Sequence, residues 1–176
     1  AAAGGVTSIM DMPNTNPLTV TLDALNAKFD LLNEKSIVNH SCYFGATNDN
    51  YTEFDKLDKH RVCGIKLFMG SSTGNMLVDK MNSLLKIFNG TDMLIAAHCE
   101  DQETIKANIE KYRQKYKGAD DIPVNAHPGI RSVPACYASS ELAVRLARIA
   151  GARLHILHVS TAKELQLFRD EPLEAK

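Results

Sequence analysis

Hydrophobic residues follow two alternating patterns along this chain. Short apolar runs, typical of buried parallel strands, recur between segments whose apolar residues are spaced three or four apart, as on one face of a helix. Strict alternation of the two indicates a parallel α/β sheet. The pattern predicts strands at 6–12, 36–44, 62–68, 93–97 and 154–158, and helices at 22–35, 53–59, 81–88, 105–116, 139–149 and from about 162.

Residues that favour helix ends lie at three of these boundaries. Thr19 or Thr21 is placed to cap the first helix, and Ser139 or Ser140 to cap the long helix nearer the carboxyl end, because a hydroxyl accepts a hydrogen bond from the first turn. Gly118 is expected to end the helix before it. The proline-containing stretch after this glycine is longer than ordinary connections, so we expect a binding loop there.

Units of this kind form either a complete doubly wound sheet or part of an eight-unit barrel. The length of 176 residues by itself favours the sheet, since a barrel usually needs about 250. Neither Gly-x-Gly-x-x-Gly nor Gly-Lys-Ser/Thr occurs, so the sequence indicates no nucleotide site. Residues 70–75 resemble a phosphate loop only in composition, because the lysine of that motif is missing.

Composition narrows the class of partner and the compartment. The formal charge is −1, from 20 basic and 21 acidic side chains, so we expect neither nucleic acid nor a membrane surface as partner. No apolar stretch approaches the roughly 20 residues that cross a bilayer. The four cysteines form no CxxC pair and suit a reducing compartment, so a cytoplasmic location is expected. Because the chain opens without Met, we expect it to be a fragment.

Three polar residues lie at or near the carboxyl end of a predicted strand: Lys66, His98 and His158. The carboxyl ends of parallel strands converge on one face, so these side chains are candidates for one site. Burial should lower the pKa of Lys66 and leave a neutral amine, which can add carbon dioxide to form a carbamate. A carbamate can bridge two divalent cations, and neutral imidazoles are usual zinc ligands. Taken singly, each residue is more often structural; together they indicate a metal site.

Other histidines and an acid lie near these positions. Glu100 is expected to hold the second ring nitrogen of His98, or else to interact with a helix N-terminus. His155 lies three residues before His158, so on a strand it would face the opposite side and pack or support the ligands. His40 could reach a barrel interior, although most lone histidines are not ligands.

Two loops carry groups that suit an acidic substrate. His127 and Arg131 lie in the long proline-containing stretch, where they either bind substrate or stabilise the loop. Asn14 follows the first predicted strand and could hydrogen-bond a carboxylate or an amide, in a loop stiffened by Pro13 and Pro17. An ordinary Asx-turn is the alternative for Asn14.

In this order the motifs resemble those of the dihydroorotase family. Members of this family are metal-dependent (β/α)8 barrels of the amidohydrolase superfamily. The resemblance runs through nearly all 176 residues, and the Met-Pro-Asn-Thr segment at 12–15 favours dihydroorotase over dihydropyrimidinase or allantoinase. The segments that carry it are 3–7, 11–17, 64–74, 97–100, 127–132 and 154–161.

The resemblance implies a partial (β/α)8 TIM barrel, about strands two to six, with residues 1–176 as the central part of one catalytic domain. It implies reversible cyclisation of N-carbamoyl-L-aspartate to L-dihydroorotate in pyrimidine biosynthesis, by a longer parent that is commonly a homodimer. Lys66 would be the carboxylated lysine bridging two zinc ions, with His98 and His158 ligating one of them. Asn14 would bind the substrate carboxylate, and Arg131 is a second candidate for contact with substrate.

The family's remaining site residues have no counterpart here. Its first strand carries a His-x-His pair and an Arg, and its last strand carries an Asp, whereas the first histidine here is His40 and Asp170 lies in the last predicted helix. We therefore expect the isolated chain to be inactive. Three alternatives stay open: an allantoinase or hydantoinase, a catalytically dead dihydroorotase-like scaffold subunit, and a self-contained flavodoxin-like binding domain without metal.

Overall fold

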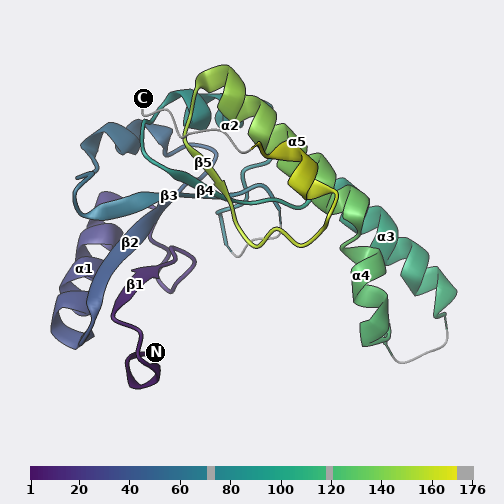
Figure 1. The fold of residues 1–176 in the computed structure, drawn as a ribbon, viewed down its shortest axis with the longest axis horizontal. Coiled ribbons are helices and arrows are strands. Elements are labelled where there is room, and N and C mark those ends of the chain that lie inside the picture. The colour runs from purple at the N-terminus through teal and green to yellow at the C-terminus, as the bar shows by residue number, and fades with distance from the viewer. Residues whose placement is uncertain (71–73, 118–120, 170–176) are drawn as a thin grey trace.

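Five parallel strands form one curved sheet, in which each strand pairs with the next one along the chain (Figure 1). The structure is a computed structural model that describes residues 1–70, 74–117 and 121–169. The strands are β1 (Ser8–Asp11), β2 (Asn39–Gly45), β3 (Val62–Phe68), β4 (Ile95–His98) and β5 (Leu154–Ile156).

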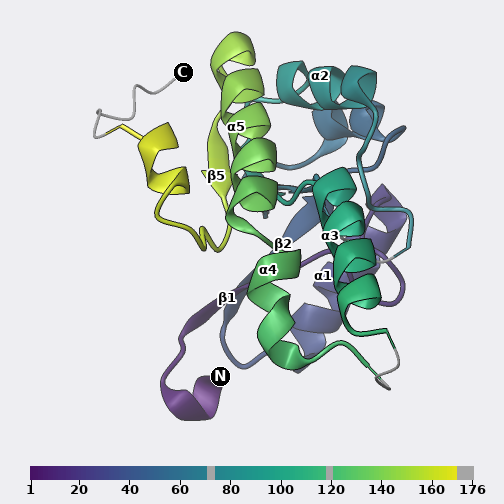
Figure 2. The same cartoon turned by 90° about the vertical axis from the view of Figure 1, so that its right-hand side faces the viewer.

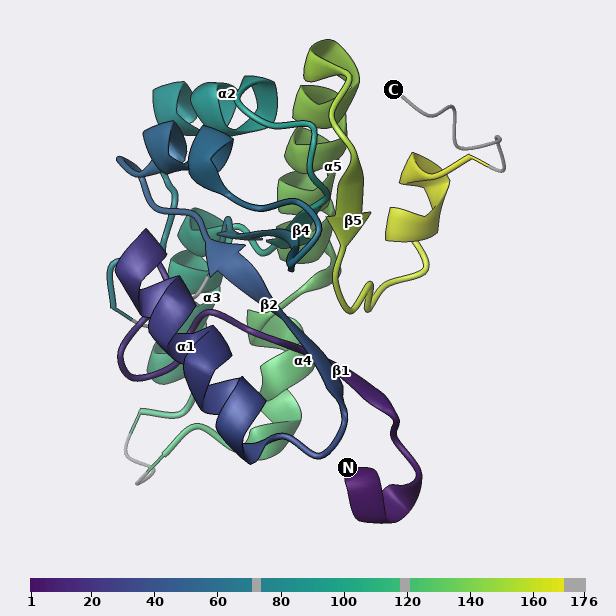
Figure 3. The same ribbon diagram turned by 90° about the vertical axis from the view of Figure 1, so that its left-hand side faces the viewer.

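Helices lie along the outer side of this arc of strands (Figure 1). Figure 3 shows α1 beside β1 and β2, whereas α5 lies at the β5 side of the sheet. In Figure 2, α3 and α4 pack on each other below α5. The α-helices are α1 (Leu22–Lys35), α2 (Met81–Asn89), α3 (Gln102–Lys115), α4 (His127–Ile130) and α5 (Val133–Ala150), and the 3-10 helices are η1 (Ala2–Gly4), η2 (Tyr51–Lys56), η3 (Val124–Ala126) and η4 (Glu164–Leu167).

The strand order decides between the two architectures that the sequence left open. A doubly wound sheet reverses its strand order at a switch point and carries helices on both faces. Here the order is β1-β2-β3-β4-β5 without reversal, and the helices follow one face (Figure 1). The expected partial barrel is therefore confirmed, and the self-contained flavodoxin-like sheet is wrong.

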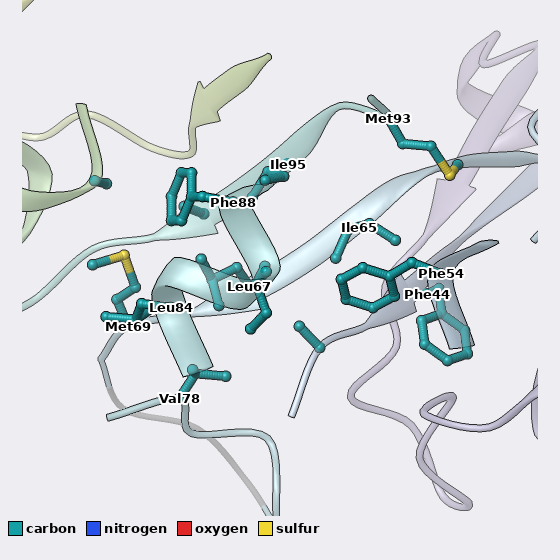
Figure 4. Close-up of a cluster of buried hydrophobic side chains, with 14 of the residues drawn as sticks. Phe44, Phe54, Ile65, Leu67, Met69, Val78, Leu84, Phe88, Met93 and Ile95 are labelled. Carbon is teal, nitrogen blue, oxygen red and sulfur yellow. The ribbon is translucent and has the colours of Figure 1, made fainter. Parts of the chain in front are cut away.

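A hydrophobic core fills the space between the outer face of the sheet and the helices (Figure 4). Ile65 and Leu67 of β3 point into it, together with Ile95 of β4. From α2, Leu84 and Phe88 pack against these strand residues. Since successive side chains of a strand face opposite sides, burial of Ile65 and Leu67 places the residue between them on the inner face.

Local sequence signals place most elements correctly. The boundaries of α1 and β3 agree with the expected 22–35 and 62–68. Thr21 caps α1, since its hydroxyl accepts a hydrogen bond of 3.2 Å from the backbone N–H of Ala24. None of the described helices is both long enough and apolar enough to span a membrane.

The sequence-based prediction differs most from the structure at the amino-terminal end of α5. This helix begins at Val133, not at a cap formed by Ser139 or Ser140, and both serines are buried within it. Pro134 in the first turn is compatible with a helix start, because a first-turn residue needs no N–H partner. The serine hydroxyls suggested a cap, but they face the protein interior.

The expected long loop is also partly helical. It contains η3 and α4, which are too short to show an apolar period. Up to residue 169, the segment expected to be helical from about 162 contains the short 3-10 helix η4. The expectations for residues 71–73, Gly118 and Asp170 lie outside the described residues.

One pair of matched substitutions tests this arrangement of the core. Ile87 of α2 is 0% exposed and Ile149 of α5 is 71% exposed. Ile87→Ala should lower the free energy of unfolding by about 2–5 kcal/mol, because it leaves a cavity. Ile149→Ala should change it by less than about 0.5 kcal/mol. Denaturant unfolding measures both, and equal losses would contradict the placement of the core.

Candidate active site

The inner face of the sheet brings two of the three strand-end residues into one place. In the β3–β4 register, Lys66 pairs with Ala96 and Phe68 pairs with His98. Residues two apart on a strand share a face, so the side chains of Lys66 and His98 both point to the inner face. His158 follows β5 by two residues and completes the group from the neighbouring strand.

The imidazoles of His98 and His158 are in direct contact. Nδ1 of His98 lies 2.8 Å from Nε2 of His158, and the ring centroids are 4.8 Å apart. The other ring nitrogen of His98, Nε2, lies 3.0 Å from Oε2 of Glu100, so the expected contact of this acid is present. Desolvation lowers the pKa of His98, which keeps its imidazole neutral near pH 7. One ring nitrogen of each histidine therefore faces the other.

His158 reaches this position through an unusual backbone conformation. It has φ 41°, in the left-handed region that residues other than glycine seldom adopt. The strand ends at Ile156, so strand alternation does not extend to His158. The expectation that His155 faces the opposite side is therefore wrong: His155 pairs with Ala96, which places it on the same inner face.

Lys66 is buried, with its side-chain nitrogen among apolar groups. The residue is 3% exposed, and Nζ lies 3.5 Å from the ring centroid of Phe68. Nζ donates a hydrogen bond of 3.1 Å to the carbonyl oxygen of Leu67, and within the described part of the chain it forms no ion pair with a carboxylate. Desolvation lowers the pKa of Lys66 from 10.5 to about 8, although nearby Cys99 partly opposes the shift. The lowered pKa that the sequence predicted is confirmed.

Arg131 lies at this site but contacts protein. It follows α4, and its guanidinium donates to Oε2 of Glu100, the oxygen that also contacts His98. Glu100 is only 8% exposed, so this ion pair compensates a charge held largely away from water. Gly70 allows the backbone to pack closely against Glu100, because a Cβ at this position would lie 2.8 Å from the carbonyl oxygen of Glu100. His127 is exposed at the start of α4.

The structure does not bring the other candidates into contact with the histidine pair. Asn14 is exposed after β1, two strands away from β3 in the sheet. His40 contacts Asn33 of α1 through Nε2, at 3.1 Å, so a role as a ligand inside the barrel is not supported.

Sequence reasoning missed Lys28. Its Nζ donates to the carbonyl oxygen of Met12 at 2.7 Å and pairs with Asp11 at 2.8 Å, which fixes the chain just before Asn14. No local motif marks a helical lysine for this task, because its partners are 16 and 17 residues away.

These residues fit part of a metal centre. Within the described ranges, no group of three or more histidine, cysteine, aspartate or glutamate side chains is arranged to hold a metal ion. Two facing imidazole nitrogens, one supported by a carboxylate on its other nitrogen, are nevertheless the donors and the outer support that zinc sites use. A carbamate on Lys66 would add oxygen donors beside them. The donor set suits a divalent metal but is incomplete.

Comparison with known proteins agrees with this geometry. No protein-family model matches the chain. It is 31% identical over 180 residues to the dihydroorotase of Methanosarcina mazei, with 100% of this chain and 38% of that protein covered. It is 29% identical to the dihydroorotase of Methanosphaera stadtmanae, with 97% and 38% covered. The chain thus spans about 38% of the length of these curated relatives.

Solved structures share the same fold. The L-hydantoinase (dihydropyrimidinase) of Arthrobacter aurescens superimposes with a TM-score of 0.85 at 29% identity, covering 94% of this chain and 37% of that one. A D-hydantoinase structure gives a TM-score of 0.78 at 23% identity, with 94% and 36% covered, and supports the fold alone. By sequence and by fold, the chain is a dihydroorotase-like part of a barrel of the amidohydrolase superfamily.

Proposed function

We propose that the chain is the central part of the catalytic domain of a dihydroorotase, which cyclises N-carbamoyl-L-aspartate reversibly to L-dihydroorotate in pyrimidine biosynthesis. The observation that supports this most directly is the His98–His158 pair beside the buried Lys66. Similarity to curated dihydroorotases along 97% to 100% of the chain favours this substrate. The remaining site residues would come from the rest of a longer parent.

Each residue of the site would have a distinct part in the reaction. The neutral amine of Lys66 would attack carbon dioxide and lose a proton to solvent, which gives a carbamate anion able to bridge two zinc ions. His98 and His158 would ligate one of them. When bound, such metals supply hydroxide at neutral pH and polarise the ring carbonyl. Glu100 keeps His98 oriented by accepting from its Nε2.

Substrate binding would involve the two loop residues. Asn14 carries an exposed carboxamide on a short loop after β1, and it would hydrogen-bond the substrate carboxylate. Arg131 would place positive charge at the rim while its guanidinium holds Glu100. We further propose a cytoplasmic, homodimeric parent without nucleic-acid or membrane partners, in line with the near-zero net charge of the chain.

A hydantoinase-type activity is the second candidate. The observation in its favour is the fold match to the L-hydantoinase of Arthrobacter aurescens, at a TM-score of 0.85. Such enzymes would share the metal-binding residues proposed here and differ in the groups that bind the ring substituents. Asn14 and Arg131 are therefore the residues on which the choice of substrate would depend.

Substrate assays on the full-length protein test the assignment. We expect turnover of carbamoyl-aspartate and dihydroorotate, lost on chelation and restored by Zn²⁺, and no comparable turnover of allantoin or dihydrouracil. Lys66→Ala and His98→Ala should each lower kcat/KM at least about 100-fold, because each removes a metal ligand. The control His60→Ala, at an exposed position, should leave kcat/KM unchanged. Preference for dihydrouracil would favour the hydantoinase. A folded protein that binds no metal and has no activity would favour the scaffold subunit.

The isolated chain should be inactive even if its parent is an enzyme. The His-x-His pair and the strand-end Asp of the family have no counterpart in its sequence, so the second metal would lack its ligands. Purified residues 1–176 should therefore show no hydrolysis of dihydroorotate above background. Turnover that is sensitive to a chelator and abolished by Lys66→Ala would contradict this.

Burial of Lys66 also makes stability depend on pH. In the metal-free protein its pKa falls from 10.5 to about 8, so between these values the unfolded chain binds a proton that the folded protein does not. The contribution of Lys66 to stability should therefore rise with pH across this interval, by roughly 1.4 kcal/mol for each pKa unit, and this gain should be lost as pH falls to 8. The free energy of unfolding, measured in bicarbonate-free buffer with chelator at pH 7.5 and 10.5, tests this prediction. Lys66→Met should lack this component, so an identical pH dependence in both proteins would disprove it.

A further inference from the structure

One buried carboxylate has no part in the chemistry proposed above. Among the described residues, three charged side chains are buried: Lys66, Glu100 and Glu164. The first two belong to the candidate site, whereas Glu164 is the first residue of η4 and is 2% exposed. Removing a carboxylate from water is costly unless hydrogen bonds compensate it, so its contacts are informative.

Both oxygens of Glu164 accept hydrogen bonds from parts of the chain that are distant in sequence or in secondary structure. The hydroxyl of Ser140, in the middle of α5, donates to Oε1 at 2.6 Å. The backbone N–H of Thr161 donates to Oε2 at 3.1 Å, and the Thr161 hydroxyl donates to the same oxygen at 2.9 Å. The carboxylate therefore joins α5 to the segment between β5 and η4.

The contact with Thr161 has a local explanation, but the contact with Ser140 does not. Thr161 and Glu164 form the reciprocal pattern of a capping box, since the backbone N–H of Glu164 also points to the Thr161 hydroxyl, at 3.4 Å. A capping box needs no third partner and no burial. The additional bond to Ser140, 24 residues away, ties this turn to the helix that flanks β5.

The segment tied down in this way is the one that carries His158. At its start, the backbone N–H of Leu157 donates to the carbonyl oxygen of Ala97 in β4 at 2.9 Å. At its end, Thr161 is held by Glu164. Between them, the Ser160 hydroxyl donates to the carbonyl oxygen of His158 at 2.7 Å. A left-handed residue such as His158 persists only where surrounding contacts hold it.

We propose that Glu164 is a positioning residue for His158. By anchoring Thr161 to Ser140 of α5, it holds the segment 157–161 so that the imidazole of His158 stays against that of His98. The effect on the imidazole pair follows from geometry alone, whereas its effect on metal affinity rests on the proposed function.

The choice of variants follows from the hydrogen-bond pattern. Glu164→Ala removes both anchors and leaves the donors of Thr161 without an acceptor. Glu164→Gln preserves them, because its carbonyl oxygen can accept from Thr161 while its amide N–H donates to the Ser140 hydroxyl. Ser140→Ala removes only the link to α5 and leaves the capping box. Ile87→Ala, in the core at α2, controls for loss of stability without change at the segment.

Zn²⁺ affinity of the full-length protein, measured by competition with a chelator, is the first readout. Glu164→Ala should lower it at least about 10-fold, the usual lower bound for removing a residue that orients a ligand. Glu164→Gln should stay within about 3-fold of wild type, and Ser140→Ala should fall between the two. Ile87→Ala should retain wild-type affinity despite its lower stability. Wild-type affinity in Ser140→Ala, or an equal loss in Glu164→Gln and Glu164→Ala, would overturn the proposal.

The second readout separates this proposal from the metal-binding function. In the metal-free protein, the imidazole ¹H–¹⁵N signals of His98 and His158 report their contact by NMR. They should shift in Glu164→Ala and Ser140→Ala, and remain as in wild type in Glu164→Gln and Ile87→Ala. If wild type binds no Zn²⁺ but these shifts occur, the metal site fails and the positioning role stands. Unchanged signals in Ser140→Ala would refute the positioning role whatever the metal result.

Discussion

The parallel register between β3 and β4 is the constraint on which the candidate site depends. It sets Lys66 opposite Ala96 and Phe68 opposite His98, and the same pairing sends Ile65 and Leu67 into the core under the helices. A shift of one residue would move the lysine into that core and the apolar residues to the inner face. Burial of the apolar side chains therefore also determines which polar side chains meet.

Three buried charged residues are accommodated in different ways. Glu100 pairs with a guanidinium, and Glu164 accepts from two hydroxyls and a backbone N–H group. Among the described residues, the side-chain nitrogen of Lys66 contacts a carbonyl oxygen and an aromatic ring, which do little to stabilise its positive charge relative to water. Its neutral form is accordingly favoured, and a neutral amine is what carboxylation requires. Lys66 is thus the member of the set that suits the proposed carboxylation.

The histidine pair combines contributions from three parts of the chain. The register of β4 places His98, and Glu100 two residues later holds its second nitrogen. His158, in contrast, depends on a turn that is not part of any strand. Its position is decided by contacts of the segment 157–161 with β4 and α5. A site made at strand ends is therefore only as precise as the loops that leave those strands.

Much of this protein can be derived from its sequence alone. The apolar periodicity determined the alternation of strands and helices, including the bounds of α1 and β3, because burial imposes those periods locally. Motif order also indicated the family and Lys66, His98 and His158 as candidates. Only the tertiary structure decided that the strands are in barrel order, that α5 begins at Val133 and that His155 shares the inner face. Contacts such as Glu164 with Ser140 and Arg131 with Glu100 join residues 24 and 31 positions apart, and no local pattern specifies them. They exist because packing of helices on the sheet brings distant polar groups together where water is excluded, and each must then find a partner.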